Sequence, residues 1–213
     1  MSEVKQALTE QQIKQRNRMV LLFIVATPVV IIILSTVMYY MADSRTIDMG
    51  TVNRGDLINP PIAVPALHLQ SGEASPFVAK GKDGTPLWTF LILAGDRCDE
   101  ACKQLVYLTR QTHKALPKQF KKIQRVILVN ADFDSNTRNA LIREDSDLHW
   151  VTGSPARLVE ALEKSGVDRS DNDFYLVDPQ GWLMMRYHAR ALDGDTINAL
   201  GKDVIKDVKR LIP

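Results

Sequence analysis

The sequence predicts an α/β domain, with a mixed central sheet and helices on both of its faces, behind a single membrane-spanning helix. Two observations predict the domain. Short apolar runs rich in β-formers alternate with amphipathic helical patterns, and the only two cysteines, Cys98 and Cys102, lie where a central strand gives way to a helix. The spanning helix is predicted by residues 19–41, an apolar run without a charged side chain.

The composition is that of a globular protein with one appendage. The 213 residues are 45% hydrophobic and 24% charged, which argues against disorder. The 27 basic and 25 acidic residues leave a net charge of +2. With no basic stripe along the chain, no nucleic acid partner is expected. Two cysteines are too few for a disulfide scaffold or a four-cysteine zinc site.

The N-terminal segment predicts a single-pass anchor. A helix over residues 19–41 rises about 1.5 Å per residue and crosses a hydrocarbon core of about 30 Å. A cleaved signal peptide is the alternative, but its apolar region is shorter, about 7–15 residues, and residues 39–42 form a poor cleavage site. Basic residues cluster in residues 1–18, so the positive-inside rule predicts a cytoplasmic tail there. Everything after Ala42 then lies outside, in the periplasm if the membrane is a bacterial inner membrane.

Glycines and prolines interrupt the stretch after the anchor. Residues 42–66 are therefore predicted to be a linker, and residues 67–213 the folded domain. Short strands are expected at 67–69 and 77–79.

The predicted elements of the domain alternate in type along the chain. They are a strand at 88–93, a helix from the cysteine loop to Leu116, a strand at 125–129, a helix at 137–144, a strand at 148–151, a helix from Pro155 that Ser154 caps and Gly166 ends, a hairpin of strands 174–177 and 182–187, and a helix at 196–212. This order is that of a thioredoxin-like fold, with the cysteine pair at the carboxyl end of the first central strand.

The position of Cys98 and Cys102 predicts chemistry at sulfur. Backbone N–H groups and the positive end of the helix dipole face the sulfurs at such a junction, and Arg97 adds a charge; all three favour the thiolate. A thiolate pair closes as a disulfide or holds a soft metal ion. In the redox alternative the more exposed Cys98 attacks a partner disulfide, and Cys102, shielded one turn into the helix, resolves the mixed disulfide. A purely structural bridge stays open as an alternative, although so short a loop gains little from it.

The acidic side chains next to the cysteines, and the histidines elsewhere in the chain, bear on the predicted chemistry. Asp99 and its acidic neighbours form a rim that opposes the thiolate by like charge. A metal held by the cysteines needs further ligands, and His113 is too far along the helix, about 16 Å from Cys102. His149 and His188 are the candidates for a third ligand.

Three motifs in the same order resemble the Sco/SenC family of thioredoxin-like copper-centre assembly proteins. They are Cys98-x-x-x-Cys102 after an apolar strand, Thr152-Gly153-Ser154-Pro155 opening a helix, and Phe174-Tyr175-Leu176-Val177-Asp178-Pro179-Gln180-Gly181 as strand and turn. The resemblance covers most of residues 60–213, and the single anchor matches it. It implies a role in assembling the copper centre of cytochrome c oxidase.

Two departures from the family pattern bear on copper. Asp99 stands where the family has a proline after the first cysteine. The family also has a histidine just before the strand that ends in Asp-Pro, and residues 167–173 contain none; Arg169 or Ser170 stands in its place. The two cysteines therefore carry over, and the three-ligand copper site does not.

The sequence thus predicts a membrane-anchored periplasmic protein that assists cytochrome c oxidase assembly. Its activity would be thiol–disulfide exchange, Cu(I) handling, or both, at Cys98 and Cys102; copper is the cofactor that the second activity would require, and no other cofactor is expected. Oxidase subunits or other assembly factors would be its partners. The alternative is a non-catalytic scaffold that keeps the fold and has lost the copper ligand.

Overall fold

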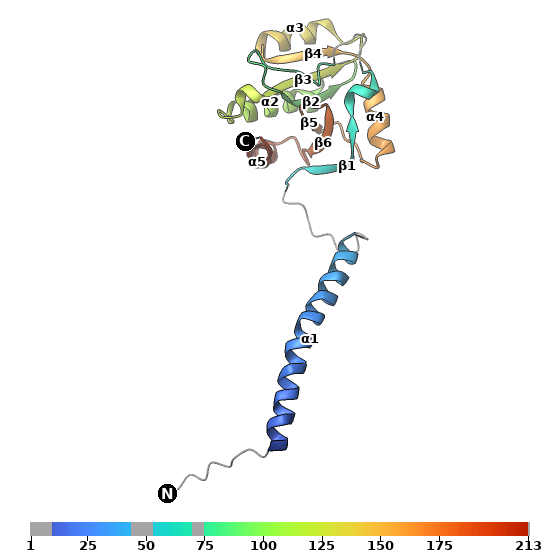
Figure 1. Ribbon diagram of the computed structural model, residues 1–213. Coiled ribbons are helices and arrows are strands. Elements are labelled where there is room, and N and C mark those ends of the chain that lie inside the picture. Colours follow the sequence, from blue (N-terminus) through green and yellow to red (C-terminus); the bar gives the residue numbers. More distant parts are fainter. Residues whose placement is uncertain (1–9, 44–52, 70–74, 213) are drawn as a thin grey trace. The chain divides into compact units, whose positions relative to one another are not determined.

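The computed structural model describes residues 10–43, 53–69 and 75–212, in two units that divide after Thr51. The first unit contains helix α1, Glu10–Asp43 (Figure 1). By length and composition, Lys14–Met41 can cross a membrane as a single span, and its side chains are exposed. Thr27 and Thr36 donate their hydroxyl groups to carbonyls one turn back, so these polar groups are satisfied inside the helix.

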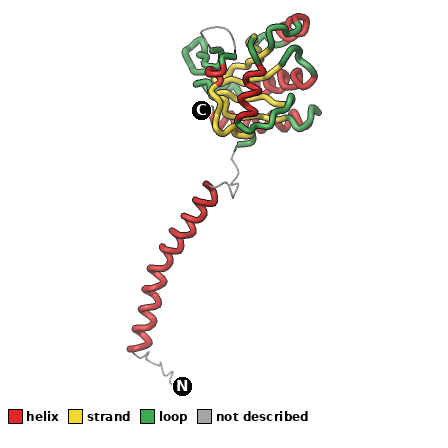
Figure 2. Tube along the Cα trace, turned by 90° about the vertical axis from the view of Figure 1, so that its right-hand side faces the viewer, coloured by secondary structure: helices red, strands yellow, loops and turns green. Residues whose placement is uncertain are grey.

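The second unit is built on a six-stranded mixed sheet in the order β1-β6-β5-β2-β3-β4 (Figures 1 and 2). Strands β2, β3 and β4 run parallel, whereas the pairs β2–β5, β5–β6 and β6–β1 are antiparallel. Their bounds are Asp56–Ala63 (β1), Trp88–Ala94 (β2), Ile123–Val129 (β3), Leu148–Thr152 (β4), Asp173–Val177 (β5) and Trp182–His188 (β6).

Helices cover both faces of the sheet. They are α2 (Glu100–Lys114), α3 (Ser135–Glu144), α4 (Pro155–Lys164) and α5 (Gly194–Leu211), with short 3₁₀ turns at Val64–Leu67 and Phe120–Lys122. Side chains of α2, α3 and α5 share one apolar core with the two cysteines, the cysteine-side core. Those of α4 and the first 3₁₀ turn share a second core on the other face, the α4-side core. Strand alternation divides the sheet's side chains between the two cores.

Local sequence signals place several boundaries. Pro155 begins α4 and Gly166, with φ +72°, follows its end, as the sequence predicts. Ser154 stands at the expected N-cap position, but its side chain makes no capping hydrogen bond. Helix α5 begins two residues before the predicted start because the Asp193 carboxylate accepts the N–H groups of Asp195 and Thr196.

The domain begins earlier than the boundary predicted at residue 67. Of the predicted linker, residues 44–52 lie outside the described residues, but 56–63 form β1, which pairs with β6 at the sheet edge. Two prolines in β1 suggested a linker, and an edge strand tolerates them because one of its sides needs no N–H donors. The segments 67–69 and 77–79 are not strands. They are a 3₁₀ end and a turn that bury Leu69 and Phe77.

Candidate redox site

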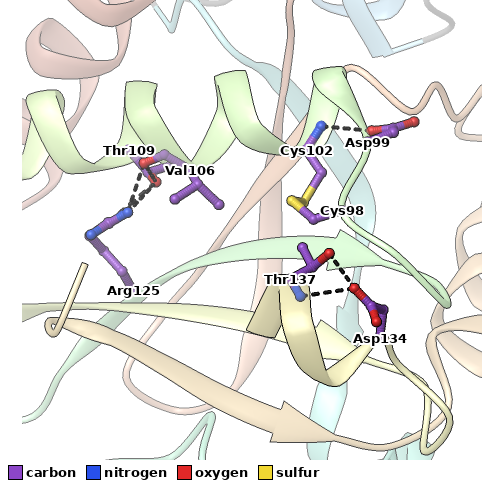
Figure 3. The surroundings of a disulfide bond; sticks show 8 residues. All are labelled: Cys98, Asp99, Cys102, Val106, Thr109, Arg125, Asp134 and Thr137. Carbon is purple, nitrogen blue, oxygen red and sulfur yellow. Dashed lines mark hydrogen bonds between the residues drawn. A yellow bond between two sulfur atoms is a disulfide. The ribbon is translucent and has the colours of Figure 1, made fainter. Parts of the chain in front are cut away.

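Cys98 and Cys102 form a disulfide at the carboxyl end of β2 (Figure 3). Cys98 lies in the loop before α2 and Cys102 in its first turn, with their Cα atoms 5.1 Å apart. Cys98 is 6% and Cys102 4% exposed, and both belong to the cysteine-side core. The pair is therefore in place as the sequence predicts. The predicted contrast between an exposed first cysteine and a shielded second one is absent from the oxidised form.

Asp99 caps the helix that carries Cys102. Its Oδ1 accepts the backbone N–H of Cys102 at 2.9 Å, and α2 begins at the next residue, Glu100 (Figure 3). An aspartate is a good N-cap because it satisfies an N–H that has no partner within the helix. The same carboxylate lies between the two cysteines in sequence and occupies the backbone N–H of Cys102. This capping role explains how the chain accommodates Asp99 at the position of the family's proline.

The cysteine loop is fixed to the loop after β3. The backbone N–H of Asn130 donates to the Gly95 carbonyl at 3.1 Å, and that of Asp134 donates to the Asp96 carbonyl at 3.0 Å. The Asn130 amide also donates to the Asp96 carboxylate. Asp134 in turn caps α3 and accepts the hydroxyl and N–H of Thr137 (Figure 3), and these hydrogen bonds lower the pKa of Asp134. Two carboxylates, Asp96 and Asp134, thus fix the surroundings of the disulfide through hydrogen bonds.

A buried arginine holds α2 against the sheet. Arg125 of β3 is 1% exposed; its guanidinium donates to the Val106 carbonyl at 2.7 Å and to the Thr109 hydroxyl, and pairs with Asp145 at 2.8 Å. Burial lowers the pKa of Arg125, and the Asp145 carboxylate opposes that shift. In the sequence, Arg125 is predicted only as the first residue of an apolar strand. A single cation next to an apolar run was the available sequence signal of a buried ion pair, because a buried charge needs a partner.

The candidate third ligands lie on the other face of the sheet. His149 pairs across the ladder with Val126, which belongs to the α4-side core, and paired residues share a face. Tyr187 faces the cysteine-side core, so its neighbour His188 points away from it. His188 instead binds the buried Asp173, Nδ1 to Oδ1, at 2.7 Å.

The other two histidines are also engaged elsewhere. His113 stacks on Phe120, with ring centroids 4.1 Å apart, and its Nε2 lies 2.9 Å from the Phe120 carbonyl. His68 follows the first 3₁₀ turn with φ +46°. Among residues 10–43, 53–69 and 75–212, no three His, Cys, Asp or Glu side chains are placed to hold a metal ion together. Within the described chain the cysteines are thus a two-sulfur site without a third ligand.

A recess of about 440 Å³ opens between α2 and α3. Its lining begins one residue after Cys102, at Lys103, and includes the half-exposed ring of Tyr107. Thr137, which lies beside the disulfide in Figure 3, belongs to the same lining. A partner segment bound in this recess would therefore lie next to the cysteine loop.

The family profile described as "transmembrane-like, thioredoxin-like, C-terminal domain" matches residues 88–213, more than half of the chain. The chain belongs to this family. The match covers the sheet from β2 onward, the cysteine pair and α2–α5, and it confirms the predicted thioredoxin-like fold. Among curated proteins, no sequence matches the chain.

Solved structures of thioredoxin-like proteins are similar to the domain at low identity. A SCO1/SenC family lipoprotein from Bacillus anthracis is 20% identical, with 63% of this chain and 91% of that chain covered and a TM-score of 0.43. ScoI of Bradyrhizobium japonicum with copper bound is 15% identical over 58% and 94% of the two chains, with a TM-score of 0.37. The thioredoxin domain of a Bacteroides vulgatus thiol-disulfide oxidoreductase is 14% identical over 76% and 100%, with a TM-score of 0.39.

Proposed function

We propose that the chain is a membrane-anchored thiol–disulfide exchange protein that works at Cys98 and Cys102. The observation that carries the proposal is a disulfide at the junction of β2 and α2 in a thioredoxin-like fold. A bridge across three residues restricts the unfolded chain little, so structural stabilisation alone is a weak reason to keep it. Reversible oxidation of the two thiols is a stronger reason for the pair to be present.

The exchange step moves two electrons. In the reduced protein, the Cys98 thiolate attacks one sulfur of a client disulfide, and the client's other sulfur leaves as a thiolate. The Cys102 thiolate then attacks Cys98 of the mixed disulfide. The products are the Cys98–Cys102 disulfide and a client dithiol, so the structure corresponds to the oxidised product. A second dithiol donor must restore the reduced form.

The sequence supports a client and a compartment for the proposed activity. The three Sco/SenC-like motifs support a client in cytochrome c oxidase assembly, and the charge pattern around residues 19–41 supports a periplasmic domain on a bacterial inner membrane. Copper handling is a narrower form of the same proposal. Two thiolates suit Cu(I), which accepts low coordination, and a partner would then supply any third ligand.

Trapping a mixed disulfide tests the exchange activity. With Cys102→Ser, the reduced protein attacks a client disulfide but lacks the resolving thiol, so a covalent complex accumulates. The matched Cys98→Ser variant should form none. Non-reducing electrophoresis and mass spectrometry measure the adduct. Equal adducts from both variants, or none from either, would contradict the assigned roles.

Burial of the pair favours one second candidate, a non-catalytic scaffold. At 6% and 4% exposure the cysteines offer an attacking group little access, as in an inert bridge. A scaffold requires the fold and not the thiols. A Cys98→Ser, Cys102→Ser double variant would then support oxidase assembly as well as the natural chain does, whereas the exchange proposal predicts loss of that support.

A further inference from the structure

The end of the domain away from the disulfide carries a dense group of lysines that the redox chemistry does not use. Lys114, Lys118, Lys121 and Lys122 line a recess of about 460 Å³ together with Phe120. We propose that this group of five, the lysine face, docks on anionic phospholipid headgroups of the membrane that holds α1. The proposal goes beyond the exchange activity and rests on its membrane anchor.

Charge is divided between the two ends of the domain. Helix α2 has 15 residues, so about 20 Å separates the disulfide at its start from Lys114 at its end. The cysteine loop and the loop after β3 carry five carboxylates, at Asp96, Asp99, Glu100, Asp132 and Asp134, which outnumber the nearby cations Arg97 and Lys103. The recess, in contrast, has one acidic group in its lining, Asp83. A negatively charged surface therefore attracts the lysine face and repels the disulfide end.

The shape of the lysine face suits a lipid surface. The Phe120 ring is 40% exposed and is held in place by the stacked ring of His113. An aromatic ring among cations matches the boundary between headgroups and acyl chains. Lysines also adapt to such a boundary, because their long stems reach along apolar surface while the ammonium groups stay among the headgroups.

The link between the two units is short in sequence. Ten peptide steps join Asp43 to Asn53, and an extended chain gains at most about 3.6 Å per residue, or about 36 Å. The domain receives this link at Arg54 and Gly55, whose N–H groups donate to Asp207 of α5.

The turn that carries the lysine face contacts the same end of α5 through Gln119. The Gln119 amide, between two of its lysines in sequence, donates to the Ile212 carbonyl just past α5. Asp207 and Ile212 are five residues apart, which is about 7.5 Å along a helix. The hydrogen bonds of Arg54, Gly55 and Gln119 all lie within the last turns of α5, and a short link would let the lysines reach headgroups.

Hydrogen exchange of the full chain in nanodiscs tests the proposal. We expect amides of residues 114–122 to exchange more slowly in discs that contain phosphatidylglycerol than in pure phosphatidylcholine, with the protection fading at high salt. Lys118→Glu with Lys121→Glu should weaken docking at least about 25-fold, because each lysine near anionic lipid contributes about fivefold. Arg97→Glu with Lys103→Glu makes the same charge change at the disulfide end and should keep the protection.

Each outcome has a defined meaning. Equal exchange in both lipid compositions would overturn the lipid-docking proposal and would favour an acidic protein as the partner of the lysines. Equal loss of protection in both charge-reversed variants would show that the lipid attracts positive charge anywhere on the domain. It would overturn the assignment to the lysine face. Failure of the chain to enter discs at all would instead contradict the anchor. Disulfide exchange measured on the same samples stays independent of all three results.

Discussion

Asp99 sets both the geometry and the charge at the cysteine pair. Its carboxylate caps α2 through the Cys102 N–H. A proline at this position would lack the carboxylate, so the two alternatives differ by one full negative charge beside sulfur. The chain thus gains a helix cap and loses part of the thiolate stabilisation that a helix N-terminus offers.

Replacing Asp99 separates these two effects. Asp99→Asn keeps a capping oxygen and removes the charge, so stability should change by only a few tenths of a kcal/mol. The thiol pKa of the reduced pair should fall by about 0.5–1 unit. Asp99→Ala should show the same fall in pKa and also lose about 1 kcal/mol of stability. Alkylation rates against pH and urea unfolding measure the two quantities; an unchanged thiol pKa in both variants would contradict the electrostatic role.

Gly153 is required by a close backbone approach. A Cβ at this position would overlap the carbonyl oxygen of Leu69, which already accepts the Ser154 N–H at 2.8 Å. Gly153→Ala should therefore destabilise the domain by about 2–3 kcal/mol. Gly194→Ala is a matched control, since a Cβ there meets nothing within 4 Å. Thermal melting of both variants checks the contrast, and equal melting temperatures would refute the proposed overlap.

Residue roles were less predictable than residue positions. The strand-to-helix position of Cys98 and Cys102 follows from local sequence pattern. The faces on which His149 and His188 lie depend on strand register, which long-range pairing sets. Asp99 caps α2 and also adds a charge beside the cysteines. The sequence alone shows several acidic residues there without showing which of them caps α2.

Among the elements, α2 depends on a buried ion pair for its position. Arg125→Met would leave the Asp145 carboxylate buried without its partner and should cost about 3–5 kcal/mol. Asp145→Leu combined with Arg125→Met should recover most of that loss, because no unpaired charge remains. Urea unfolding of the two variants measures the difference. Equal stabilities would contradict the account of the pair.

His113 gives the α2 terminus a pH dependence. Burial lowers the pKa of His113, the Phe120 carbonyl partly opposes this shift, and nearby Arg125 adds to it. Below the unfolded pKa of about 6.5, the unfolded chain takes up a proton that the folded chain refuses. The free energy of unfolding should therefore be fully present above about pH 6.5 and fall as the pH drops toward the lowered pKa.

Denaturant titrations at about pH 7.5 and 5.5 test this prediction. His113→Gln keeps a donor for the Phe120 carbonyl and removes the titrating ring, so its stability should vary less between the two pH values. A variant with the same pH dependence as the natural chain would exclude His113 as the cause.

Elements with strong local signals were predictable, and one with weak signals was not. Strand β2 and the start of α4 follow from apolar runs and from Pro155. Strand β1 carries Pro60 and Pro61 and has an irregular register between Leu57 and Ile62. Its pairing depends on β6, more than 100 residues later, so local sequence favours a linker there.

At the scale of the molecule, the chain combines an apolar helix with a redox-type domain of uneven charge. The disulfide and its carboxylates lie at the carboxyl ends of the parallel strands, and the lysine face lies at their amino ends. Under the proposed function, a client would meet the cysteine loop at the end of the domain that carries these carboxylates. Docking through the proposed lysine face would leave the disulfide end of the domain accessible.

The central claim is that Cys98 and Cys102 form a working redox pair. The most direct test equilibrates the full chain in thiol–disulfide mixtures of graded potential, from glutathione to dithiothreitol, and counts alkylated cysteines by mass spectrometry. Reversible exchange predicts that both thiols appear together in one two-electron transition while circular dichroism stays native. A disulfide that opens only when the domain unfolds would contradict the claim and favour the scaffold.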